Sequence, residues 1–343
     1  MIKNTFTYCF IFFLTSAIFC QNDFKNTNFP KEKIFVHVNN NFFLTGEQIL
    51  YSIYCLDAKK NSFTKLSKIA YVELLNNKNK SVFKQKIKLK NGKGFGDLFL
   101  KSSLKTGTYK LISYTQWMRN QQTFFEETIF IVNPFSNKLK EKDSLNKNNF
   151  KPFLNKNTKL ITLNLNKQKY LKREKVILNL SHKYSSSISI SVRKIVNLNL
   201  PNKLNSNRFL NTHKKSEITS KKIYLPELRG ELFQGKITSK KNDVSNKKVG
   251  LSFTGENKIT KITSTNNSGK FYFNVNKNYS SDKVTIEVLD NDFDYKINLI
   301  NNNILEKRFS DFSTLYLTEP IRKHIKELSF FRHDQPRNAK RTD

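Results

Sequence analysis

The sequence predicts an all-β protein built from tandem β-sandwiches, with a short helix near its C-terminus. Apolar and polar residues alternate at strand period in many short segments. Turn signals such as Asn91-Gly92 separate these segments. A helical spacing of apolar residues occurs near residues 318–330, where Thr318 can cap the helix and Ile321, Ile325 and Leu328 share a face.

The first sandwich is expected over residues 31–133. About seven short strands in about a hundred residues are the signature of a β-sandwich. One of these strands follows Ser81, and its residues alternate between two faces. Phe83, Gln85, Ile87 and Leu89 face one way, and Lys84, Lys86, Lys88 and Lys90 face the other. We therefore expect a half-buried strand with a solvated row of lysines. A later strand is expected over Thr108 to Trp117.

Four further segments follow the first sandwich. Residues 134–157 are polar and predict a linker, and residues 158–226 predict a second, partial unit with strands at 160–165, 176–180 and 188–192. Residues 227–300 predict a third sandwich, and residues 301–343 form a tail that contains the helix.

A short internal sequence repeat, called the echo below, links the first two units. Phe43-Leu44-Thr45-Gly46-Glu47-Gln48-Ile49 matches Tyr170-Leu171-Lys172-Arg173-Glu174-Lys175-Val176 in the order aromatic, Leu, two turn residues, Glu, polar, β-branched. Each copy follows one expected strand and precedes another. The echo therefore predicts two tandem copies of one module, with the turn as a repeating joint.

Residues 1–20 predict a secretion signal. Lys3 precedes an almost wholly apolar run from Phe6 to Phe19, which is short for a membrane span. Cleavage is expected between Cys20 and Gln21, and a lipid anchor on Cys20 is the alternative. The predicted location is the periplasm, or the outer membrane and cell surface.

After removal of the signal, Cys55 is the one cysteine left in the expected mature chain, so no internal disulfide can form. Cys55 is expected to be a small buried hydrophobic residue.

The formal net charge of +34 does not predict a nucleic-acid partner here. Lysine is spread along the whole chain and mixed with asparagine, whereas a nucleic-acid site would be a local basic cluster with stacking aromatics. We expect envelope proteins or surface glycans as partners, and peripheral membrane association stays open. The sequence does not indicate an oligomeric state.

Candidate chemical motifs have structural explanations. Gly92-Lys93-Gly94-Phe95-Gly96 lacks the helix that a phosphate loop needs, so a hairpin is expected. Asp290 to Asp294 has Tyr295 where a calcium loop needs Gly, so an acidic turn is expected. None of the five histidines has metal-ligand spacing to another ligand: His37, His182, His213, His324 and His333. No Gly-x-Ser-x-Gly elbow occurs. The sequence predicts no enzyme and no catalytic, cofactor or metal residue, and it identifies no binding residue.

The first unit resembles the MG2 macroglobulin-type domain of alpha-macroglobulins. The matching residues are Lys33 to Val38, Phe43 to Ile49, Tyr71-Val72-Glu73-Leu74, Gly96-Asp97 and Gly107-Thr108-Tyr109-Lys110-Leu111. The segment Tyr114 to Asn120, with its Trp-Met-Arg-Asn ending, resembles the version in large exported proteins of Bacteroidetes-type bacteria. The resemblance implies the fold and an extracytoplasmic setting. Thr45 precedes Gly46-Glu47-Gln48, so the thioester of trapping macroglobulins is not present there.

The third unit resembles the carboxypeptidase regulatory-like domain, a transthyretin-type sandwich. The matching residues are Gly235 to Thr238, Lys248 to Phe253 and Thr265 to Phe273. In that family this domain order often precedes a plug-like domain of outer-membrane receptors, which raises the hypothesis that the chain is a shortened form of a larger protein. The function expected is a non-catalytic envelope scaffold that acts through β-sandwich modules. A macroglobulin-type endopeptidase inhibitor without a thioester is the alternative.

Overall fold

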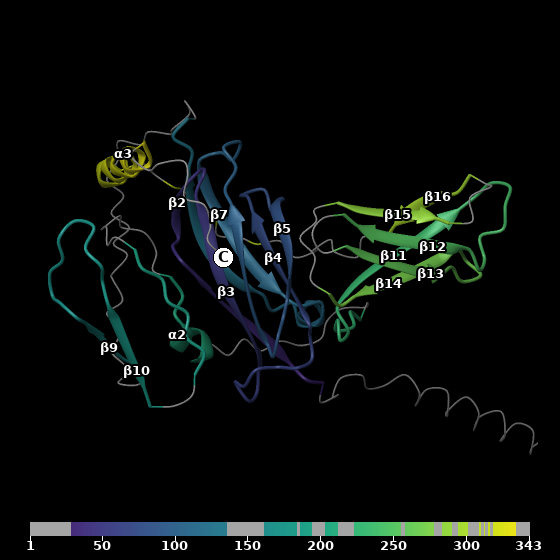
Figure 1. The fold of residues 1–343 in the computed structure, drawn as a ribbon, viewed down its shortest axis with the longest axis horizontal. Coiled ribbons are helices and arrows are strands. Elements are labelled where there is room, and N and C mark those ends of the chain that lie inside the picture. Colours follow the sequence, from purple (N-terminus) through teal and green to yellow (C-terminus); the bar gives the residue numbers. More distant parts are fainter. Residues whose placement is uncertain are drawn as a thin grey trace, which may run out of the picture.

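A computed structural model describes most of the chain after residue 28. The described residues are 29–135, 161–183, 186–193, 203–211, 223–254, 258–277, 283–289, 294–300, 309, 312, 315 and 318–333. The predicted signal and most of the predicted linker lie outside them. The described part is mostly β-strand, as the sequence predicts. Figure 1 shows two multi-stranded β units, with a long two-stranded hairpin on the far side of the first.

The first unit is a β-sandwich of two sheets. One sheet has the order β1-β3-β6, and the other has the order β2-β8-β7-β4-β5. The strands are β1 (Glu32–Val38), β2 (Phe42–Leu44), β3 (Gln48–Asp57), β4 (Ile69–Leu75), β5 (Ser81–Lys88), β6 (Lys93–Phe99), β7 (Gly107–Tyr114) and β8 (Phe125–Val132). β2 and β8 are parallel, and the other neighbours are antiparallel.

The core of this sandwich consists of the residues that alternate inward from both sheets. Ile34, Val36 and Val38 of β1 are almost completely buried, as their strand period predicts. The rings of Tyr71 and Tyr114 stack at 5.2 Å between centroids in the facing sheet. Burial of this apolar surface is the main stabilising term, and the chain has no disulfide among the described residues to add to it.

The strand expected over Thr108 to Trp117 ends earlier than the sequence predicts. β7 stops at Tyr114, and a short 3-10 helix, η2 (Trp117–Gln121), follows before β8. The hydroxyl of Thr115 accepts the backbone N–H of Met118, so it holds the first turn of this helix. The Trp-Met-Arg-Asn motif therefore lies on a helical turn and not on a strand.

The second unit is less complete than a sandwich in the described residues. It has one antiparallel hairpin, β9 (Ile161–Leu165) and β10 (Leu178–His182), and the short helix α2 (Ser206–Asn211). The expectation of a strand over 188–192 is wrong, because that segment makes no strand ladder. It lies instead against the outer face of the first sheet, where the hydroxyl of Ser191 is 3.4 Å from Nε2 of His37, and Lys93 donates to the hydroxyl of the preceding Ser187 at 2.8 Å.

The third unit is a second sandwich. Its two sheets have the orders β14-β11-β16 and β13-β12-β15. The strands are β11 (Glu231–Thr238), β12 (Lys248–Phe253), β13 (Ile259–Ser264), β14 (Lys270–Val275), β15 (Val284–Val288) and β16 (Lys296–Leu299). Ile237, Leu251 and Phe271 are fully buried between the sheets. Gly269 has a φ of +75° in the turn at Asn267-Ser268-Gly269, a conformation that glycine adopts without strain.

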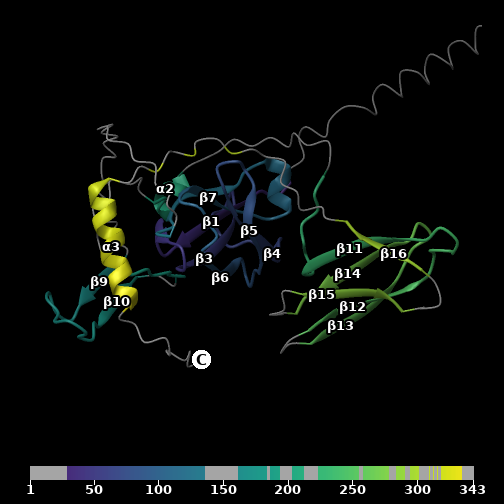
Figure 2. The same cartoon turned by 90° about the horizontal axis from the view of Figure 1, so that it is seen from above.

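The C-terminal helix returns to the first unit. α3 (Glu319–His333) buries Ile321 against Phe42 and Val132, and Ile325 and Leu328 pack at the edge of the same cluster. The predicted helix and its apolar face are confirmed. Figure 2 shows α3 at the end of the first sandwich opposite the third unit. Across the described ranges, no helix has the length and apolarity needed to cross a bilayer.

Candidate functional site

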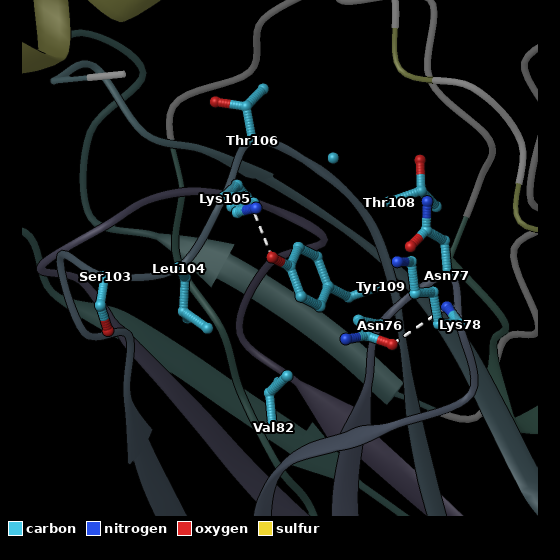
Figure 3. Close-up of a pocket in the computed structure, with 11 residues that line it drawn as sticks. Asn76, Asn77, Lys78, Val82, Ser103, Leu104, Lys105, Thr106, Thr108 and Tyr109 are labelled. Carbon is cyan, nitrogen blue, oxygen red and sulfur yellow. Dashed lines mark hydrogen bonds between the residues drawn. The ribbon is translucent and has the colours of Figure 1, made fainter. Parts of the chain in front are cut away.

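A pocket lies at one end of the first sandwich, between the β4–β5 turn and the loop before β7. Its volume is about 380 Å³. Figure 3 shows Tyr109 in its wall, with the phenol donating to the carbonyl of Lys105 at 2.7 Å. Most of the residues that line it are polar in type, although the surface that they turn to the pocket is mainly apolar; they are Asn76, Asn77, Lys78, Val82, Ser103, Leu104, Lys105, Thr106, Gly107, Thr108 and Tyr109.

The polar groups of this pocket are largely occupied in holding its loops. The Asn76 side chain accepts the N–H groups of Lys78 and Lys80, each at 3.0 Å, and so fixes the turn. The Thr106 hydroxyl accepts the N–H of Asn133 at 2.9 Å. The lining holds no His, Cys, Asp or Glu, so it offers hydrogen-bond donors and two ammonium groups without an acid–base pair.

A second site is the joint between the first and third units. We use "polar joint" for Tyr71, Lys86, Lys88, Arg119 and Asn120 of the first unit, together with Tyr224, Glu227, Glu231 and Asn276. In Figures 1 and 2 the third sandwich lies beyond β4 and β5 of the first.

The η2 helix holds the start of the connecting segment. The Asn120 side chain donates to the carbonyl of Tyr224 and accepts its N–H, both at 2.7 Å. The guanidinium of Arg119 lies 3.8 Å from the centre of the Tyr224 ring, in a cation–π contact. Two hydrogen bonds and a stacked cation at one residue fix both the position and the direction of the chain there.

Glu227 anchors the next part of the connecting segment on β4. Its backbone carbonyl accepts the N–H of Lys68 at 2.9 Å, and its Oε1 accepts the hydroxyl of Tyr71 at 3.0 Å. Burial raises the pKa of Glu227 to about 7, and the Tyr71 hydrogen bond and the Lys86 charge offset part of this rise. The protonation state of Glu227 therefore changes close to neutral pH.

The lysine row on β5 is part of the joint. Lys84, Lys88 and Lys90 are exposed, as the expectation of a solvated row predicts, but Lys86 is half-buried. Lys86 forms an ion pair with Glu231 and lies 5.1 Å from the Phe233 ring centre. Lys88 donates to the carbonyl of Asn276 at 2.8 Å. Lys84 pairs with Glu73 at 2.8 Å within the first unit. Alternation shows that these residues share a face, and the third unit covers part of that face.

The residues that the sequence offers as candidates for a nucleophile, a phosphate loop or a metal site have structural roles where they are described. Cys55 is buried, and burial raises the pKa of its thiol well above the ordinary value, so it is unreactive. Asn91 and Gly92 both have positive φ, so the Gly92–Gly96 motif is a hairpin leading into β6. Asp290 to Phe293 and His213 lie outside the described residues. Within the described ranges, no three His, Cys, Asp or Glu side chains gather as metal ligands.

The repeated turn has the same hydrogen bonds in both copies. The carboxylate of Glu47 accepts the N–H of Leu44 at 2.6 Å, and that of Glu174 accepts the N–H of Leu171 at 2.8 Å. Leu50 lies eleven positions after Asn39, and Ile177 lies eleven positions after Asn166; each Asn side chain accepts the later N–H at 3.0 Å. The predicted equivalence of the two turns is confirmed at the level of single atoms.

Sequence reasoning did not find the polar joint. Its acidic members lie in the stretch from Tyr224 to Glu231, which connects two expected sandwiches. Acidic residues are sparse in this chain, with 27 against 61 basic ones, so Glu227 and Glu231 close together at a boundary are a usable signal. The signal shows where an ion pair could form, but it does not identify the lysine partner.

No protein-family model and no curated protein matches the chain. Solved structures do resemble it. The native conformation of E. coli alpha-2-macroglobulin has a TM-score of 0.26 and 10% identity, over 71% of this chain and 12% of that chain. Salmonella alpha-2-macroglobulin reacted with methylamine has a TM-score of 0.26 and 9% identity, over 81% of this chain and 15% of that chain. A tetra-tandem repeat from the extending region of a large adhesion protein has a TM-score of 0.23 and 8% identity, over 71% of this chain and 65% of that chain. The chain thus spans about an eighth of the length of the E. coli protein.

Proposed function

We propose that this chain is an exported, non-catalytic protein of the cell envelope that acts as a structural and binding scaffold. The observation that supports this best is the polar joint, which connects two β-sandwiches through paired side chains and not through a bare linker. Such a joint restricts the orientation of one module relative to the next. A restricted orientation is useful in a protein that presents binding surfaces at fixed positions.

The export part of the proposal rests on the apolar run from Phe6 to Phe19 and the polar residues after Cys20. The proposed location is the periplasm, or the outer membrane and cell surface. Envelope proteins or surface glycans are the proposed partners. The loop ends of the sandwiches, including the pocket beside Tyr109, are the surfaces where such partners would bind.

The finer family assignment also belongs to this proposal. The residues quoted above resemble a macroglobulin-type domain of Bacteroidetes-type bacteria for the first unit and a carboxypeptidase regulatory-like domain for the third. The η2 helix carries part of the first resemblance, and its residues have an identifiable structural role. Its Trp-Met-Arg-Asn motif supplies the two side chains that hold Tyr224 in place.

Cell fractionation with a C-terminally tagged chain tests the export proposal. We expect the chain in the periplasmic or outer-membrane fraction, shortened at its N-terminus. Retention of the full-length chain in the cytoplasm would contradict it.

Capture of partners from cross-linked envelope fractions tests the scaffold proposal. Asn120→Ala serves as the variant that loosens the joint. Equal recovery of partners by wild type and variant would show that the joint does not serve binding.

A panel of endopeptidases separates the scaffold from the alternative, an endopeptidase inhibitor without a thioester. We expect no loss of protease activity when the chain is added in molar excess. Stoichiometric inhibition of one protease would replace the scaffold proposal.

A further inference from the structure

The β9–β10 hairpin has one strongly apolar face. The strand register pairs Leu163 with Leu180, Leu165 with Leu178 and Ile161 with His182, so these six side chains share one face and five of them are apolar. Polar residues occupy the other side, namely Thr162, Asn164, Asn179 and Ser181. Leu163 is 55% exposed, and none of the apolar residues of this face belongs to a buried cluster of the described residues.

The equivalent face of β1 and β3 is part of the core of the first unit. The turn equivalence aligns β1 with β9, so Val36 corresponds to Leu163 and Val38 to Leu165. The pair Val38–Tyr51 of β1 and β3 corresponds to the pair Leu165–Leu178. Val36 is 1% exposed because the second sheet covers it. The hairpin thus presents to solvent a face whose counterpart requires an apolar cover.

The loop of this hairpin carries a dense positive charge. Between Asn166 and Ile177 it contains five basic residues, Lys167, Lys169, Lys172, Arg173 and Lys175. The only acidic residue there is Glu174, which pairs with Lys167. The first-unit loop from Asn39 to Leu50 makes the same hydrogen bonds and contains no lysine or arginine. The charge is therefore a property of the second copy, and the turn geometry does not require it.

An apolar residue lies at the tip of the charged loop. Leu171 is 82% exposed and is followed directly by Lys172 and Arg173, both exposed. An apolar tip and an apolar face bordered by cations match the interface of a bilayer that contains anionic lipid. There, apolar side chains enter the acyl boundary while lysine and arginine stay at the headgroups.

Two other occupants fit less well. A second copy of the chain brings the same basic loop, so like charges oppose pairing of the two faces. Nucleic acid would neutralise the cations but would leave Leu163, Leu180 and Leu171 without an apolar phase. We propose that the β9–β10 hairpin docks the chain on an anionic lipid surface. This docking goes beyond the scaffold function, and purified lipid tests it independently of export.

Vesicle co-sedimentation with the purified chain tests the proposal. The chain should bind vesicles that contain phosphatidylglycerol more tightly than vesicles of phosphatidylcholine alone, and added salt should weaken this binding. Changing four cations together, K169Q, K172Q, R173Q and K175Q, should weaken binding about tenfold or more. The matched control changes four exposed lysines of the third unit, K236Q, K240Q, K241Q and K270Q, and should bind like wild type. An equal loss in both variants would show that net charge alone acts and would overturn the proposal.

Two further variants test the apolar contribution. Leu171→Trp places a reporter at the exposed tip, and its fluorescence should shift to the blue with phosphatidylglycerol vesicles, whereas Trp117 is already buried. Leu163→Ser with Leu180→Ser should lower vesicle binding and leave the oligomeric state of the chain unchanged. An unshifted Leu171→Trp spectrum on bound vesicles would overturn the proposal. So would a wild-type dimer that this double change dissociates, because a second copy would then cover the face.

Discussion

Asn120 and Tyr224 are joined by two hydrogen bonds of 2.7 Å: the side-chain N–H of Asn120 donates to the backbone C=O of Tyr224, and the side-chain oxygen of Asn120 accepts the backbone N–H of Tyr224. An amide side chain offers N–H donors and a carbonyl acceptor in one plane, so it imitates a neighbouring strand for one residue, and a second N–H of Asn120 donates to the carbonyl of Trp117 at 3.0 Å. Asn120 is 1% exposed, and the Arg119 guanidinium stacks on the Tyr224 ring. The connecting segment is therefore fixed on the first sandwich before the third begins.

Asn120→Ala should destabilise the protein by about 1–3 kcal/mol, because two backbone groups of Tyr224 lose buried partners. Chemical denaturation measures this loss, and limited proteolysis should show faster cleavage within residues 223–231. Asn77→Ala removes an exposed asparagine of the same unit and should leave both measurements unchanged. Cleavage at the wild-type rate in Asn120→Ala would show that the joint does not depend on this pair.

Glu32→Ala should destabilise the first sandwich more, by about 3 kcal/mol or more. The Glu32 carboxylate is buried and accepts four hydrogen bonds, from the hydroxyls of Thr64, Ser67 and Thr115 and from the N–H of Ser67. Removing it leaves these donors without an acceptor. Glu32→Gln keeps the shape and one acceptor oxygen, so urea unfolding should show a smaller loss. Equal losses in the two variants would contradict this account.

Glu227 should make stability fall as the pH rises through neutrality. Its folded pKa of about 7 lies above the ordinary 4.5, so its contribution is fully present below pH 4.5 and is lost as the pH rises through about 7. Glu127, whose pKa burial also raises to about 7, acts in the same direction. These two carboxyl groups should therefore lower the melting temperature between pH 5 and pH 7.5, and the lowered pKa of His37 opposes them over part of that range.

Glu227→Gln should reduce that fall, because glutamine has no proton to lose. Melting curves of wild type and variant at both pH values measure the difference. Glu287→Gln, at an exposed position of β15, is the control and should keep the wild-type pH dependence. A pH dependence that is unchanged in Glu227→Gln would exclude this residue as its source.

Gly46→Ala should destabilise the first sandwich by about 1 kcal/mol. Gly46 has a φ of +84° in the repeated turn, a conformation that costs an L-residue free energy. Arg173 holds the equivalent position of the second copy at a φ of +66°, so Arg173→Gly should relieve strain there. Gly107→Ala is the control, since an added Cβ meets nothing within 4 Å. A larger loss for Gly107→Ala than for Gly46→Ala in urea unfolding would contradict this interpretation.

Local sequence patterns predicted much of the fold, because turns, strand alternation and helix faces depend on residues that are close together in the chain. The turn at Asn91-Gly92 and the buried alternation of β1 follow from local backbone preference and strand period. The apolar face of α3 and the atomic equivalence of the Glu47 and Glu174 turns follow in the same way. Where local preference was ambiguous, prediction failed. Trp117 begins a helical turn, and the 188–192 segment alternates without pairing as a strand.

The sequence by itself determined which residues share a face, and the tertiary structure decided what covers that face. Periodicity placed Lys84, Lys86 and Lys88 together on β5, but only folding brought Glu231 and Asn276 to them across long stretches of chain. The same holds for Asn120 and Tyr224, which are 104 residues apart. Hydrogen bonds and ion pairs act over a few ångströms, so their partners follow from the packing of the sandwiches and not from spacing along the chain.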